Sequence, residues 1–209
     1  GNNTGHSLTG NFFYVEVINE SEFNDPPNTF NGDWTIGQPE AISNTYYSIA
    51  DGNWNDASTW SRQGYNGSPS SQAPNNFTEN VVFIGDGHTV TLDAVPTVGP
   101  QMTIIDSART GLDGPGRLDI PSGIHLNGDS LEVREDAILA IADPDGITQI
   151  GETDQNDGNV RCVESRDYQE DGIYIYNGVV KQFEGSGLPN LVKQLIVQNA
   201  DTLQLTKNL

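Results

Sequence analysis

Residues 47–93 decide the fold, and they read YSIADGNWNDASTWS (47–61), a polar loop with two prolines, and NVVFIGDGHTVTLD (80–93). Trp54 and Trp60 lie among Gly, Asn and Asp residues that form turns. Gly85-Asp86-Gly87 separates two short apolar runs, and such a turn predicts either a hairpin or the corner of a coil. We interpret residues 47–60 as a cap in which both indoles cover the open end of a β core.

The rest of the chain consists of short apolar runs broken by glycine turns. Leu118 and Ile120, Leu131 and Val133, and Leu195 and Val197 alternate with polar residues, which predicts strands with one buried face. The connections are uneven, being tight at 121–123 but long at 106–116 and 151–159. The pattern predicts an all-β fold, which could be a sandwich, a barrel or a β-helix. A solenoid tolerates insertions at its corners, which points to the β-helix, but the pattern alone does not separate it from a sandwich.

The order of motifs also resembles a known family. The quoted segments are Gly52-Asn53-Trp54, Ser58-Thr59-Trp60-Ser61, NVVFI (80–84), GHTVTLD (87–93), YIYNG (174–178) and LIVQNA (195–200). They resemble β-solenoid modules of large surface proteins of the Bacteroidota, and the opening segment is similar to the G8 domain. The resemblance covers residues 45–209 and implies a right-handed parallel β-helix.

This resemblance sets the expected domain organisation. Residues 45–209 form the solenoid, with residues 47–60 as its N-terminal cap and with a C-terminal end that we expect to be truncated. Residues 1–44 are too few to bury a core alone, so we expect the tail of a preceding β domain or an N-terminal flap.

Composition narrows the function. The 209 residues carry a net charge of -20, which argues against nucleic acid and anionic lipid as partners because both require a basic surface. No apolar run is long enough to span a membrane. Cys162 is the single cysteine, so no disulfide framework is expected and the thiol is interpreted as a small buried hydrophobe. An extracellular location on a bacterial cell surface fits these properties.

The sequence contains no motif for a catalytic centre. The three histidines are not clustered, and no nucleophile elbow is present. Acidic loops are the best candidates for a small ligand, because calcium prefers several carboxylate and carbonyl oxygens. The predicted calcium ligands are Asp143, Asp145, Glu152, Asp154 and Asp157, and no other cofactor is expected.

Two further sets of residues are candidate sites. The motif Asp, then Ser or Thr, then an aliphatic residue resembles the O-glycosylation acceptor of exported Bacteroidota proteins, and it predicts glycans on Ser107, Ser130 and Thr202. If exposed, aromatic side chains would instead form a sugar-binding platform. These aromatic candidates are Trp54, Trp60, Tyr65, Tyr168 and Tyr174.

The function predicted from these features is structural. The chain is expected to be an adhesive or structural module of a large secreted or cell-surface protein, forming a stiff rod or filament segment without catalysis. Its partners would be neighbouring modules, copies of itself, or surface glycans. The alternatives are a β-helix enzyme acting on polysaccharide, as a lyase or hydrolase, and a carbohydrate-binding accessory domain.

Overall fold

The computed structural model describes residues 44–75, 80–108 and 113–205. The chain divides into two compact units, Gly1–Glu40 and Ala41–Leu209, and every described residue belongs to the second. The predicted N-terminal piece, residues 1–44, therefore lies outside the described residues except for Asn44, and it stays a prediction.

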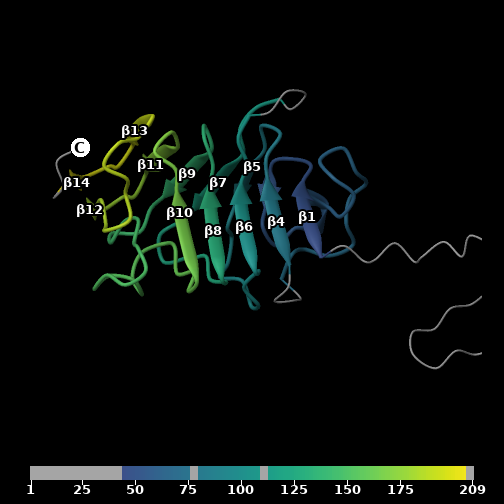
Figure 1. The fold of residues 1–209 in the computed structure, drawn as a ribbon, viewed down its shortest axis with the longest axis horizontal. Helices are drawn as coiled ribbons and strands as arrows, with labels where there is room; N and C mark the ends of the chain where they lie inside the picture. The colour runs from purple at the N-terminus through teal and green to yellow at the C-terminus, as the bar shows by residue number, and fades with distance from the viewer. Residues whose placement is uncertain (1–43, 76–79, 109–112, 206–209) are drawn as a thin grey trace, which may run out of the picture. The chain divides into compact units, whose positions relative to one another are not determined.

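The described chain is all-β and forms two six-stranded sheets (Figure 1). Sheet A has the order β10-β8-β6-β4-β1-β3, and sheet B has the order β13-β11-β9-β7-β5-β2. The strands of sheet A are β1 (Thr45–Ser48), β3 (Trp60–Ser61), β4 (Val81–Ile84), β6 (Met102–Ile105), β8 (Ser130–Val133) and β10 (Ser165–Tyr168). Those of sheet B are β2 (Gly52–Asn53), β5 (Thr89–Thr91), β7 (Arg117–Ile120), β9 (Ile138–Ile141), β11 (Ile173–Tyr176) and β13 (Gln194–Val197).

Smaller elements complete the unit. A 3-10 turn, η2 (Ala57–Thr59), precedes β3, and β12 (Gln182–Phe183) pairs with β14 (Leu203–Gln204). Among the described residues, β1 and β3 are the antiparallel pair, and the other named strand pairs are parallel. The predicted all-β class is therefore confirmed, with parallel sheets.

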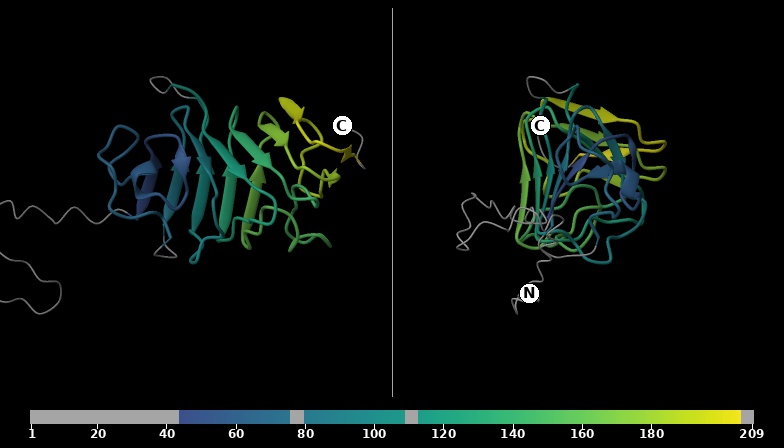
Figure 2. Two further views of the ribbon diagram at one scale, coloured as in Figure 1. Left: turned by 180° about the vertical axis from the view of Figure 1, so that it is seen from behind. Right: turned by 90° about the vertical axis from the view of Figure 1, so that its right-hand side faces the viewer.

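Successive strands from β4 to β11 alternate between the two sheets. β4 pairs with β6 in sheet A, while the intervening β5 pairs with β7 in sheet B. The Gly85-Asp86-Gly87 turn is therefore a corner between sheets and not a hairpin. Asp86 and Gly87 both adopt positive φ there, at 57° and 75°. We call each stretch that supplies one strand to sheet A and the next to sheet B a circuit; Figure 2 shows the circuits following one another along the unit.

The pairing register aligns the inward side chains of successive circuits. In sheet B the aligned positions are Val90, Leu118, Leu139, Tyr174 and Leu195. In sheet A they are Tyr46, Val82, Thr103, Leu131 and Arg166. Since parallel strands lie about 4.8 Å apart, each inward side chain packs on its equivalents above and below. These two rows of side chains supply much of the buried core.

Trp54 and Trp60 lie where both sheets end on two-residue strands, β2 and β3. Both indoles are fully buried, with ring centroids 5.3 Å apart at 75°. Trp60 Nε1 donates to Trp54 O at 2.8 Å, and Trp54 Nε1 donates to Asn75 Oδ1 at 2.7 Å. Burial with both N–H groups satisfied places these rings in the core, where they present no surface to a sugar.

The last inward position of sheet A is a buried arginine. Arg166 is 6% exposed, and it donates to Cys162 O, Thr148 Oγ1 and Gln155 O at 2.7–2.8 Å. The sequence patterns did not predict β10, because its inward residues are Arg166 and Tyr168. The apolar residues of segments 147–150 and 160–163 also predict strands, and this prediction is wrong: in the described chain, this region contains an isolated bridge between Leu126 and Val160.

The long connection 106–116 is closed at its base. Asp106 N donates to Ile84 O at 2.7 Å, and Gly116 N donates to Asp106 O at 2.9 Å. The two ends of the connection are therefore hydrogen-bonded to each other. As a result, β6 keeps its pairing with β4 and β8, and β7 keeps its pairing with β5 and β9. A Cβ on Gly116 would overlap the carbonyl oxygen of Ile84.

Gly116→Ala should therefore destabilise the fold by about 2 kcal/mol, since backbone cannot yield as a side chain does. Gly114→Ala is the matched control, because its added Cβ would meet its nearest atom, Gly87 Cα, at 3.5 Å, an ordinary contact. The control should change stability by less than about 0.5 kcal/mol. Urea unfolding of both variants tests this, and equal midpoints would contradict the close approach.

Cys162 provides a second test. Its thiol is buried, and burial raises its pKa to about 12. Because the thiolate is the reactive species, labelling by a disulfide reagent at pH 8 should be at least about a thousandfold slower in the native protein than in urea. Cys162→Ala is the control for non-specific labelling. Native labelling at the rate of a free thiol would contradict this burial.

Candidate functional site

The outer face of sheet A carries a row of aromatic, apolar and acidic side chains. The pairing register aligns its outward side chains in one row, the outer ladder, consisting of Tyr47, Phe83, Ile104, Glu132 and Asp167. This row is apolar over β1, β4 and β6 and acidic over β8 and β10. The change in character occurs where a long connection brings Asp106 beside the sheet.

The apolar half is an aromatic stack. The rings of Tyr47 and Phe83 lie 5.2 Å apart at 8°, which matches the spacing of adjacent strands. Tyr65, from the loop after β3, meets Tyr47 edge to face at 5.2 Å and 73°. Stacking along the sheet turns the ring faces toward neighbouring side chains. This half therefore stabilises the sheet and lacks the flat, open ring face on which a sugar stacks.

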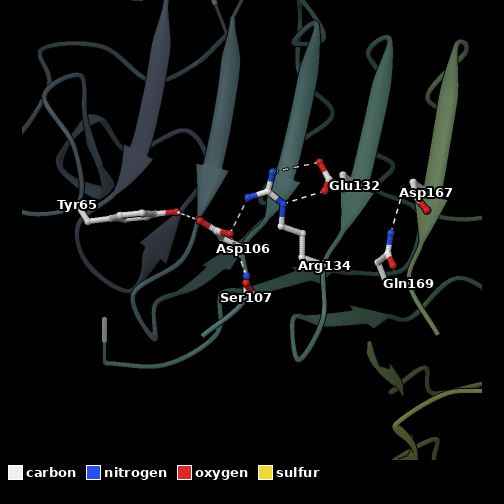
Figure 3. A network of polar contacts seen from close by, with 7 residues as sticks. All are labelled: Tyr65, Asp106, Ser107, Glu132, Arg134, Asp167 and Gln169. Carbon is white, nitrogen blue, oxygen red and sulfur yellow. Dashed lines mark hydrogen bonds and ion pairs between the residues drawn. The ribbon is translucent and has the colours of Figure 1, made fainter. Parts of the chain in front are cut away.

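The acidic half contains a polar network around Asp106 (Figure 3). Tyr65 Oη donates to Asp106 Oδ2 at 3.0 Å, and Arg134 Nη1 donates to Asp106 Oδ1 at 2.9 Å. Arg134 Nε in turn donates to Glu132 Oε1 at 2.8 Å. Arg134 thus joins two carboxylates that come from different circuits.

The carboxylate of Asp106 is buried, and donors within the protein occupy its oxygens. The Asp106 side chain is 1% exposed and also accepts from the backbone N–H of Ser107 at 3.0 Å. The hydrogen bond to Glu132, and with it the bond to Asp106, raises the pKa of the Arg134 guanidinium against the opposing effect of burial. Because the carboxylate oxygens of Asp106 already accept three hydrogen bonds, Asp106 is poorly placed to serve as a general base toward a substrate.

The last position of the outer ladder extends the polar character. Gln169 Nε2 donates to Asp167 Oδ2 at 3.1 Å, and both side chains lie beyond Arg134 along the sheet in Figure 3. The sequence prediction identified neither this network nor the aromatic stack. Asp106 and Arg134 are 28 residues apart, and only the length of the intervening circuit brings them together.

The structure separates the five aromatic candidates by exposure. Trp54, Trp60 and Tyr174 are fully buried, and Tyr168 is buried with its hydroxyl donating to Thr148 O at 3.1 Å. Tyr65 is half-buried and belongs to the aromatic stack. The five rings therefore do not form one platform.

The five predicted calcium ligands do not converge. Asp143 accepts from Asp145 N, Asp154 accepts from Ser186 N and Oγ at 3.0 and 2.6 Å, and Glu152 and Asp157 are exposed. Burial, followed by repulsion from Asp143 and Asp157, raises the pKa of Asp145. In the described chain, no three or more His, Cys, Asp or Glu residues are grouped to hold a metal ion. The calcium site stays a prediction without support from this arrangement.

The predicted glycosylation positions differ in accessibility. Thr202 is exposed and its hydroxyl donates to Asp201 at 2.9 Å. Ser107 and Ser130 are half-buried, Ser107 beside the polar network and Ser130 within β8. Of the three, Thr202 is the residue that a modifying enzyme would reach most easily.

A shallow groove of about 320 Å³ lies where the strands of sheet B end. Asp119, on its wall, is held by Arg117 Nε and Nη2 at 2.6 and 3.0 Å. Asn177 Oδ1, also on the wall, is buried without a hydrogen-bond partner. The groove thus offers one unsatisfied acceptor and contains no aromatic side chain.

Comparisons of the chain with protein-family models, curated proteins and solved structures found no match. Within the described ranges, no helix has the length and apolar character needed to cross a membrane. The functional assignment therefore depends on the residues and their geometry.

Arg134→Ala should destabilise the protein by about 2 kcal/mol, because it leaves the buried Asp106 carboxylate without its cationic partner. Arg117→Ala is the matched control, since Arg117 and Asp119 are partly exposed neighbours on one strand. Such a pair contributes no more than about 1 kcal/mol. Urea titration of both variants measures the difference, and equal losses would show that Asp106 does not depend on Arg134.

Proposed function

We propose that residues 45–209 form a right-handed parallel β-helix. The alternation of strands between two parallel sheets supports this, because it makes each circuit stack on the one before. The handedness follows the general rule that connections between parallel strands of one sheet cross over to the right.

We further propose that this β-helix is a structural or adhesive module of a large secreted or cell-surface protein. Its mechanism would be mechanical: hydrogen bonds run along the stack, aliphatic and aromatic rows fill it, and neither needs a cofactor. The observation that carries the proposal is the unbroken sheet-B register from Val90 through Leu139 to Leu195. In such a module, neighbouring modules, copies of the chain or surface glycans are the expected partners.

The charge of the chain fits this role. A net charge of -20 keeps a repetitive β surface soluble and opposes edge-to-edge association. It suits a protein outside the cell, on a bacterial surface.

A polysaccharide-acting enzyme is the second candidate, and one observation favours it. Arg134 lies between Asp106 and Glu132, and an arginine with two carboxylates is the kind of group that lyases and hydrolases employ. It ranks second because Arg134 is paired with both carboxylates and Asp106 is buried.

A glycan-cleavage assay separates the two candidates. The protein and its Glu132→Gln variant would be incubated with a panel of neutral and acidic polysaccharides, with release of reducing ends and of unsaturated products as the measurements. A structural module should release no product in either form. Product that appears with the native protein and is lost with Glu132→Gln would overturn the structural assignment and favour the enzyme.

The mechanical role has its own test. In a single-molecule pulling experiment with handles at the two ends of the described unit, the chain should be released circuit by circuit. Each step should lengthen the chain by about 7–12 nm, from the residues per circuit and about 3.5 Å per extended residue. Release of the whole unit in one step would contradict stacking as the source of its mechanical strength.

A further inference from the structure

Exposed apolar side chains are concentrated toward one end of the unit. Among the described residues, the large apolar side chains that are exposed all follow residue 162: Val163, Val179, Val180, Phe183, Leu191, Val197 and Leu205. Figure 1 shows β12, β13 and β14 at this end of the stack. Val197 follows Ile141 and Tyr176 in the sheet-B register, but it is 53% exposed where they are buried. It is exposed because nothing in the described chain covers the last rung.

The two ends of sheet B differ in their capacity to accept another strand. At the β2 end the outer strand has two residues, and the fully buried Trp54 and Trp60 lie beside it. At the other end β13 has four residues and pairs with β11, and in the described chain its second edge pairs with no strand. An unpaired edge of this kind is a template for a further strand.

The edge of β13 lacks the charged residues that ordinarily prevent an edge strand from pairing with another chain. Residues 185–200 contain no Asp or Glu in a chain that has 29 acidic residues, and Lys193 is their single charge. Lys193 is already paired with Asp136 of its own chain. Proteins ordinarily block an edge strand with charges or proline, and β13 has neither.

The direction of the backbone groups fixes how a strand would add. Gln198 N donates to Tyr176 O, so alternate residues of β13 bond to β11. In a ladder of this kind the N–H and C=O groups of Leu195 and Val197 then point to the open edge. A second strand must bond to these two residues.

We propose that the open edge of β13 binds β13 of a second copy, antiparallel, in a two-fold tail-to-tail dimer. Opposed residues in antiparallel strands share one face of the sheet. Of the registers that satisfy this and the backbone directions, the one that pairs apolar residues with apolar residues places Leu195 opposite Val197 of the partner subunit and Ile196 opposite its own equivalent on the two-fold axis. In this register the apolar side chains meet, and no charges of β13 oppose each other.

The dimer is favoured over a head-to-tail filament because the β2 end of each copy is blunted. It is independent of the proposed adhesive function, which would stand if the protein were a monomer. Two bodies of net charge -20 repel each other, so the dimer should tighten as salt screens the charges.

The test combines association state with cysteine cross-linking of the whole chain. Light scattering after size exclusion should give twice the 22.6 kDa chain mass at micromolar concentration. Val197→Lys should weaken the dimer at least tenfold, whereas Val163→Lys, at a position outside β13 that is 68% exposed, should leave it unchanged. In a Cys162→Ser background, Ile196→Cys should form a disulfide-linked dimer under mild oxidation. Gln194→Cys is the matched control and should not, since Gln194 does not face its equivalent.

The outcomes separate the possible occupants of the edge. A dimer that cross-links through Ile196→Cys and not through Gln194→Cys supports the proposal. A monomer throughout this range, or equal cross-linking at both positions, overturns it. A concentration-dependent series of larger species also overturns it, because that result indicates head-to-tail stacking.

Discussion

The structure depends on one constraint, the in-register stacking of parallel strands. Parallel pairing without a shift in register places each inward residue directly over its equivalent in the previous circuit. Apolar residues such as Leu118 and Leu139 therefore form continuous rows. Burial of a whole row contributes more stabilising free energy than burial of one short strand could. Strands of only four residues suffice because every strand between the ends of a sheet is paired on both sides.

The same constraint decides where variation is tolerated. The connection 106–116 is long, yet its base is closed by the bond between Gly116 and Asp106, so the strands on either side keep their register. The circuits also create the polar network, since Asp106 and Arg134 meet only because one circuit separates them. The network is best understood as an outer brace between circuits, in which a buried carboxylate is matched by a guanidinium. We infer that the last rung, on which no strand of the described chain stacks, is the end of the unit where another strand can add.

Much of this arrangement could be predicted from the sequence. Alternation at Leu118 and Ile120, at Leu131 and Val133, and at Leu195 and Val197 predicted strands that the structure contains as β7, β8 and β13. The Gly85-Asp86-Gly87 corner was located correctly but could not be distinguished from a hairpin. Which strand pairs with which was not accessible, because pairing depends on circuit lengths that vary. β10 was missed since the buried side chain at its second position is Arg166, whose partners are backbone oxygens and a hydroxyl from a distant loop. The outer ladder was missed because its residues become neighbours only once the strand pairing is known.

The most direct test of in-register stacking is a distance between spin labels on the outer face of sheet B. Thr89 and Gln194 are connected by the register through Arg117, Ile138 and Ile173, which makes four strand spacings. With Thr89→Cys and Gln194→Cys labelled in a Cys162→Ser background at a concentration that avoids association, pulsed electron spin resonance should give a narrow distribution near 19 Å, widened by the label arms. A broad distribution, or a mean near twice that distance, would contradict the stacked circuits.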